Sequence, residues 1–246
     1  LNIQPSEIAK LTSILCLARV LERNQFNTVF NLLKPLSVII IPWILVFVQP
    51  DLGTSLVFGA VLLVMLYWAG MPSEWGVLVV AGIITAIFVG VLPQLLFFWI
   101  PFMGFLAYRS LPKKKLAALI AIFSHSAIAF STPWIWINGL KDYQRERLTL
   151  FLDPGKDPLG GGYHLIQSQI GIGSGEIFGT GLLQGKLTKL HFIPEQHTDF
   201  IFSALGEETG FIGTMAVIFC FCFLIIKLLK ISKNARTDFE SLVVIG

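Results

Sequence analysis

The chain has 246 residues, of which 54% are hydrophobic and only 13% are charged, and its net charge is +3. A soluble domain carries roughly 25% charged residues, so this composition excludes a water-soluble globule, and the small net charge gives no reason to expect nucleic acid as a partner. The apolar residues come in long blocks, which is typical of helices that face lipid or one another.

Seven apolar segments are predicted to be membrane helices, because a bilayer core needs about 20 apolar residues, with a range of about 17 to 25. A polar, Gly-rich and charged segment, 138–200, separates the last two, and a loop of this length is usually functional. We therefore predict an all-α, polytopic transmembrane bundle that forms one membrane-embedded domain over residues 1–246, with one large loop at 138–200. The predicted helices are 8–21, 36–49, 54–69, 76–92, 95–108, 116–137 and 202–229.

Basic residues cluster at three places between the predicted helices. Positive charge in short loops marks the cytoplasmic side, and placing all three clusters there gives one consistent alternation of helices. The N-terminus, the turn at Pro50–Asp51 and the loop 138–200 are then predicted to lie outside. The clusters are Arg19, Arg23 and Lys34; Arg109 and Lys113–Lys115; and Lys227, Lys230, Lys233 and Arg236.

Two short motifs near the ends of apolar helices carry ionisable residues, which are costly at membrane depth and are functional candidates there. Glu7 and Lys10 are three residues apart and share a helix face. A helix entry capped by Ser6 with a weak surface ion pair explains them equally well. Asp51 lies between two apolar segments, and its alternative role is to cap the next helix.

The large loop contains two candidate features. Arg145 and Arg147 offer guanidinium groups that match phosphate oxygens, although a solvated, charged loop face is the alternative. The run Gly171–Gly175 is Gly-rich, but no strand precedes it, so it does not predict a nucleotide site. We interpret it as a flexible loop.

A third cluster of ionisable residues surrounds the start of the last helix. Asp199 lies at or near that helix's N-cap, where the helix dipole favours its charge. The alternative role is an ionised carboxylate that acts as a general base at the membrane surface. Glu207 and Glu208 lie further along the helix, and two acids there predict a wet, polar cavity. His191, Glu195 and His197 match no strong metal-binding spacing.

Four segments that contain these residues resemble the SEDS family, the group that includes RodA and FtsW. They are QPSEIAK at 4–10, QPDLGTS at 49–55, YQRERLTLFLDPGKDPLGGGYHLIQSQIGIGSG at 143–175, and IPEQHTDFIFSALGEETGFIG at 193–213. The sequence motif DPxxDPLGGGYHxIQS, at 153–168, is more similar to the RodA branch than to the division branch. The resemblance implies one helix before the large loop where this chain has room for three, so an extra helix pair is expected near 94–138. The chain starts at Leu1 and ends in an apolar run, so we expect a piece of a longer protein.

The resemblance implies a peptidoglycan glycosyltransferase that polymerises lipid II into glycan strands during cell-wall elongation. It acts at the outer face of the bacterial cytoplasmic (inner) membrane, with a class B penicillin-binding transpeptidase as partner. The family's key acid corresponds to Asp199, the candidate general base. A divalent cation, Mg or Mn, is a further candidate for stabilising the charge of the leaving pyrophosphate, and the sequence does not identify the residues that would bind this cation. The residues expected to bind substrate are Glu7, Lys10, Asp51, Arg145, Arg147, Gln167, Glu195, His197, Glu207 and Glu208.

Two other functions remain open from the sequence. A lipid II flippase also needs a polar cavity in a helical bundle, but it needs a path to the cytoplasmic side as well. A non-catalytic membrane scaffold of a cell-wall synthase needs no acid at Asp199.

Overall fold

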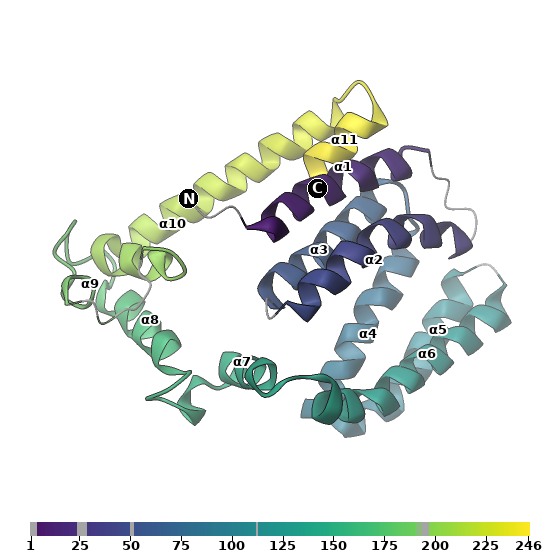
Figure 1. The fold of residues 1–246 in the computed structure, drawn as a ribbon, viewed down its shortest axis with the longest axis horizontal. Helices are drawn as coiled ribbons and strands as arrows, with labels where there is room; N and C mark the ends of the chain where they lie inside the picture. The colour runs from purple at the N-terminus through teal and green to yellow at the C-terminus, as the bar shows by residue number, and fades with distance from the viewer. Residues whose placement is uncertain (1–3, 24–28, 50–51, 112, 191, 193–196) are drawn as a thin grey trace. The chain divides into compact units, whose positions relative to one another are not determined.

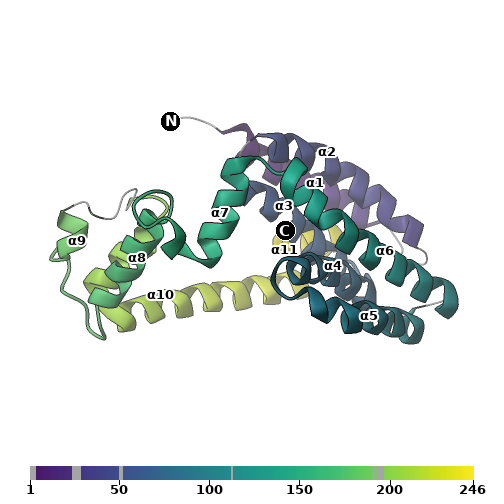
Figure 2. The ribbon, with the colours of Figure 1, turned by 90° about the horizontal axis from the view of Figure 1, so that it is seen from below.

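The computed structural model describes residues 4–23, 29–49, 52–111, 113–190, 192 and 197–246, and within these ranges the regular structure is helical, with no strand (Figures 1 and 2). Two compact units are formed. The first comprises Leu1–Leu140 with Leu229–Gly246, and the second comprises Lys141–Leu228. The α-helices are α1 (Pro5–Leu21), α2 (Leu33–Val48), α3 (Leu52–Trp68), α4 (Ser73–Val91), α5 (Leu96–Ser110), α6 (Lys114–Trp134), α7 (Asp142–Leu152), α8 (Tyr163–Ser174), α9 (Lys186–Lys189), α10 (Ile201–Lys233) and α11 (Asp238–Ile245).

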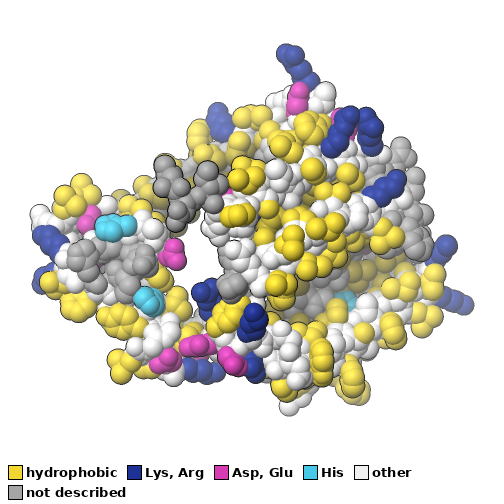
Figure 3. Space-filling model, in the orientation of Figure 1, with side chains coloured by type: hydrophobic (Ala, Val, Ile, Leu, Met, Phe, Trp, Pro, Cys, Tyr) yellow, Lys and Arg dark blue, Asp and Glu magenta, His cyan; other side chains and the backbone are white. Residues whose placement is uncertain are grey.

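Each of the seven predicted membrane segments is a helix, namely α1 to α6 and α10. Of the described helices, α4, α6 with its π-helical continuation to Gly139, and α10 are long and apolar enough to cross a membrane, and α2 and α3 are shorter apolar helices. At most 22% of the apolar window of the three long helices is buried, and hydrophobic side chains cover much of the visible surface (Figure 3). Such surfaces need lipid or further helices around them. The all-α transmembrane prediction is therefore confirmed.

The core of the first unit lies between α1, α2, α3 and α11. Leu17, Phe58, Met65 and Leu242 are almost fully buried there. One polar contact accompanies this packing, because the indole N–H of Trp68 donates a hydrogen bond to the hydroxyl of Ser241 at 2.7 Å. Where no water is available, polar groups such as this N–H must find hydrogen-bond partners within the protein.

Helices α5 and α6 pack against each other and against α4, in the region where the sequence predicts an extra helix pair. A buried polar contact joins the three helices. The hydroxyl of Thr85 on α4 shares a 2.7 Å hydrogen bond with Nδ1 of His125 on α6 and accepts another, 3.0 Å long, from the indole N–H of Trp99 on α5. Interhelical hydrogen bonds of this kind stabilise transmembrane packing.

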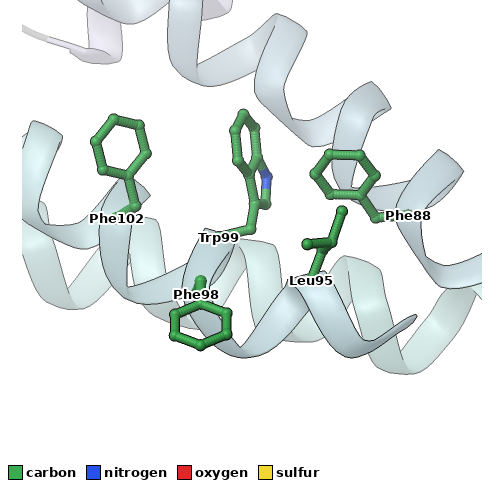
Figure 4. Close-up of a pocket in the computed structure, with 5 residues that line it drawn as sticks. All are labelled: Phe88, Leu95, Phe98, Trp99 and Phe102. Carbon is green, nitrogen blue, oxygen red and sulfur yellow. The ribbon is translucent and has the colours of Figure 1, made fainter. Parts of the chain in front are cut away.

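Aromatic side chains add to the contact between α4 and α5. The rings of Phe88 and Trp99 meet edge to face with centroids 5.3 Å apart, a favourable geometry for aromatic pairs. These two side chains line an apolar groove together with Leu95, Phe98 and Phe102 (Figure 4).

The second unit contains the predicted loop 138–200 from Lys141 onward, and this segment includes the helices α7, α8 and α9. The central feature of the unit is the parallel packing of α8 against the start of α10. His164 lies against Phe200, Ser168 is hydrogen-bonded to Ser203, and a Cβ on Gly206 would lie 3.2 Å from Ile172. The contacts advance in the same direction along both helices, so the two N-termini lie at the same end.

The prediction of a flexible loop at Gly171–Gly175 is wrong, because this run forms the end of α8 and its C-cap. The glycines there permit close packing. A Cβ on Gly175 would lie 1.9 Å from the carbonyl oxygen of Gly206, so only a residue without a side chain lets the backbones approach this closely.

Helix α10 is broken at Gly210, where φ is 66° and ψ is −164°. The break interrupts the regular hydrogen bonds from the N–H groups of 211 and 212 to the carbonyls of 207 and 208. The segment 176–181 replaces them: Phe211 and Ile212 donate to the carbonyls of Glu176 and Ile177, whereas Thr180 and Gly181 donate to those of Glu207 and Glu208. All four interrupted groups therefore regain partners.

Candidate functional site

Asp199 lies in the turn 197–200 that precedes α10, and it is exposed. The carbonyl of Phe200 accepts the hydrogen bonds from the N–H groups of Ser203 and Ala204, so Phe200 rather than Asp199 occupies the N-cap position. Among the described residues, no capping hydrogen bond engages the Asp199 carboxylate. The side chain is therefore open to a ligand, as a general base must be.

Helix α8 supports the turn that carries Asp199. The imidazole of His164 stacks on the ring of Phe200, with centroids 6.2 Å apart and planes inclined by 10°. Gln167, half-buried on α8, is three residues from His164 and shares its helix face. His197 is exposed in the same turn as Asp199. The structure therefore brings α8 and the turn together, and it adds His164, which no sequence pattern distinguishes from its neighbours.

Glu207 does not face an open cavity. Its side chain is only 1% exposed, and its two carboxylate oxygens accept hydrogen bonds from the N–H of Leu187 (2.8 Å), the N–H of Thr188 (2.9 Å) and the hydroxyl of Thr188 (2.7 Å). The carboxylate thereby holds α9 against α10. The prediction of a wet, polar cavity is therefore wrong at Glu207, because α9 fills the space around its carboxylate. Glu208 is half-buried.

Arg145 and Arg147 lie on α7. The guanidinium of Arg145 forms an ion pair with Asp142, whose side chain is 97% exposed, and Arg147 is exposed. Exposed ion pairs contribute little to stability, so Arg145 can exchange this partner for a phosphate at small cost. The two arginines therefore remain available to an anionic ligand.

The turn between α7 and α8 has a defined shape. The carboxylate of Asp157 accepts hydrogen bonds from the N–H groups of Gly160 and Gly161, both 3.0 Å long. A Cβ on Gly162 would lie 2.2 Å from the carbonyl oxygen of Pro154. A Cβ on Gly160 would meet the side chain of Asp157, and one on Gly161 would meet that of Leu150, so of the three glycines Gly162 is the one that close backbone contacts require.

Glu7 and Lys10 form an ion pair 2.8 Å long on α1, with side chains 58% and 23% exposed. The alternative in which Ser6 caps this helix is excluded, because α1 begins at Pro5, Gln4 occupies the N-cap position, and the buried hydroxyl of Ser6 has no hydrogen-bond partner among the described residues. Glu7 and Lys10 belong to the first unit and Asp199 to the second, so the expectation that Glu7 and Lys10 bind the substrate on which Asp199 acts stays a prediction.

Two predicted site residues, Asp51 and Glu195, lie outside the described residues, as does His191. Within the described ranges, no group of three His, Cys, Asp or Glu side chains lies close enough to hold a metal ion.

The chain matches a family model, FTSW_RODA_SPOVE, described as cell cycle protein, over residues 1–99 and 92–246. Peptidoglycan glycosyltransferase MrdB of Escherichia coli (strain K12) is 35% identical over 237 residues, which cover 96% of this chain and 52% of that protein. Peptidoglycan glycosyltransferase RodA of Treponema pallidum (strain Nichols) is 33% identical over 280 residues, covering 100% of this chain and 63% of that protein. The chain thus spans about half to two thirds of the length of these relatives.

A solved structure shares the fold. It is described as "Structural coordination of polymerization and crosslinking by a peptidoglycan synthase complex", and one of its chains matches with a TM-score of 0.63 and 26% identity over 100% of this chain and 55% of that chain. The family match extends over nearly every described element, from α1 to α11. This chain therefore belongs to the FtsW/RodA/SpoVE family of membrane proteins, the SEDS family, and within it is RodA-like.

Proposed function

We propose that the protein to which this chain belongs is a peptidoglycan glycosyltransferase that polymerises lipid II into glycan strands. The observation that carries the proposal is the open carboxylate of Asp199 at the start of α10, in the segment that resembles the family's key acid motif. The similarity to the MrdB and RodA proteins, whose names specify this activity, supports the same reaction.

In the proposed reaction, Asp199 is the general base. Its carboxylate takes the proton from the acceptor sugar hydroxyl, whose oxygen attacks the anomeric carbon of the donor sugar. A new glycosidic bond forms as the bond to the lipid pyrophosphate breaks, and the pyrophosphate leaves with the electron pair. Cationic groups that meet this developing charge lower the barrier, and Lys10 and Arg145 are the protein groups proposed for that role.

The remaining predicted residues are proposed to bind the sugars, the pyrophosphate or a divalent cation. The exposure of Arg147 and His197 supports this proposal, and Gln167 is half-buried on α8, the helix whose His164 contacts Phe200. Glu207 is assigned to the structural support of this region instead. The proposed binding residues are Glu7, Lys10, Asp51, Arg145, Arg147, Gln167, Glu195, His197 and Glu208.

A class B penicillin-binding transpeptidase is the proposed partner. The similar solved structure is described as a synthase complex that coordinates polymerisation with crosslinking, which supports a partner that crosslinks the strands. The proposed location is the bacterial cytoplasmic membrane, with Asp199 at its outer face.

Purified full-length protein, with and without the partner transpeptidase, should convert lipid II into glycan strands in detergent, as measured by gel separation of labelled product. Neither a flippase nor a non-catalytic scaffold would make glycan strands in this assay, because the transpeptidase crosslinks strands and does not polymerise lipid II. No polymer under either condition would contradict the proposed function.

The outer location of Asp199 leads to a topological prediction. In a cysteine-free background, Lys156→Cys should react with a membrane-impermeant thiol reagent in intact cells, whereas Lys114→Cys should react only after permeabilisation. The reason is that Lys113–Lys115 form a basic cluster in a short loop. Labelling of position 114 but not 156 in intact cells would exclude catalysis at the outer face.

A further inference from the structure

A general base needs a fixed position, yet Asp199 lies in an exposed four-residue turn. Reacting groups must be held close to their productive geometry, and a displacement of about 1 Å can lower the rate by roughly 10²-fold. Asp199 itself makes no hydrogen bond to another described residue that would fix its carboxylate. Its position must therefore be set through its neighbours.

The immediate neighbour, Phe200, has a defined contact. Its ring lies nearly parallel to the imidazole of His164, with planes inclined by 10° and centroids 6.2 Å apart. Two rings that lie parallel at this distance are in an offset arrangement, which is favourable for aromatic pairs. This contact depends on the shape of a flat ring and not on a hydrogen bond from His164.

His164 is itself held on a well-supported helix. The ring of Tyr163 meets its edge with centroids 6.1 Å apart, and Gly162, which close backbone contacts require, directly precedes that helix. One turn further on, the hydroxyls of Ser168 and Ser203 are hydrogen-bonded, which ties α8 to the first turn of α10. All these residues lie within the second compact unit.

We propose that His164 is a positioning residue for Asp199. Its ring, stacked on Phe200, sets the direction in which the turn presents the Asp199 carboxylate to the acceptor hydroxyl. The inference rests on the proposed function, because it assigns Asp199 the role of general base. It differs from a direct role of His164 in proton transfer, since a ring without nitrogen can make the same stack.

Two substitutions in the full-length protein separate these roles. His164→Ala removes the stack and should lower kcat for lipid II polymerisation about 10- to 100-fold, with KM for lipid II changed by less than about twofold. His164→Phe keeps a flat ring and should retain at least about half of the wild-type kcat. Ile170→Ala, at an exposed position on α8, is the matched control and should leave kcat unchanged.

Several outcomes would overturn the inference. Equal loss in His164→Phe and His164→Ala would show that the imidazole acts chemically, a raised KM with normal kcat in His164→Ala would show a substrate contact, and wild-type behaviour of His164→Ala would show no role. The double variant His164→Ala/Asp199→Asn should be no slower than Asp199→Asn alone, because both act on one step. An active Asp199→Asn enzyme would instead contradict the proposed base, whatever the His164 variants do.

Discussion

Asp199→Asn should abolish nearly all glycan polymerisation by the full-length protein while leaving its expression, membrane insertion and complex with the transpeptidase normal. Asn has the same size as Asp, but its amide cannot take up a proton near neutral pH. General base catalysis is typically worth about 10²- to 10⁴-fold, so the rate should fall by at least that lower factor. The measurement is the initial rate of lipid II polymerisation by purified wild-type and variant protein.

The structure makes this substitution a clean test. The carboxylate of Asp199 is exposed and does not cap α10, whose first carbonyl acceptor is that of Phe200. Little stability should therefore be lost, and the thermal midpoint should change by no more than about 2 °C. If the Asn variant polymerises lipid II at more than about a tenth of the wild-type rate, the assignment of Asp199 as general base is wrong. Such a loss would be smaller than the rate enhancement that a general base typically provides.

Gly210→Ala should destabilise the second unit strongly. Gly210 has φ of 66° and ψ of −164°, a region open essentially to glycine, where other residues cost about 1–3 kcal/mol. A Cβ there would also lie 2.4 Å from the N atom of Gly179 and 2.7 Å from the carbonyl of Ile177. The segment 176–181 would have to move, and its hydrogen bonds to α10, each worth about 0.5–1.5 kcal/mol, would be lost.

The expected loss is about 4 kcal/mol or more, which corresponds to a drop of at least about 8 °C in the thermal midpoint. The midpoint can be measured by heating detergent-solubilised protein and quantifying what stays monodisperse. Gly173→Ala is the matched control, because a Cβ at this helical position has no atom within 4 Å and Ala favours helix over Gly. Equal midpoints for the two variants would contradict the packing described at the break in α10.

The sequence by itself determined the membrane helices and the family. A helix in lipid must satisfy its backbone internally and present apolar side chains along its whole length, so a block of apolar residues is enough to locate it. The predicted segment 76–92 coincides closely with α4, Ser73–Val91. The position of Asp199 just before the last helix is likewise visible along the chain, whereas its role as general base stays a proposal.

Only the tertiary structure decided the roles that depend on contacts between distant segments. Glu207 looks like a functional acid in the sequence, but its carboxylate holds Leu187 and Thr188, some twenty residues earlier. Gly175 looks like part of a flexible loop, but it packs on Gly206, and the stacking of His164 on Phe200, from which its proposed role follows, is visible only in the fold. Hydrophobic periodicity and motif spacing report which residues are close along the chain, whereas these three roles follow from how α8, α9 and α10 pack together.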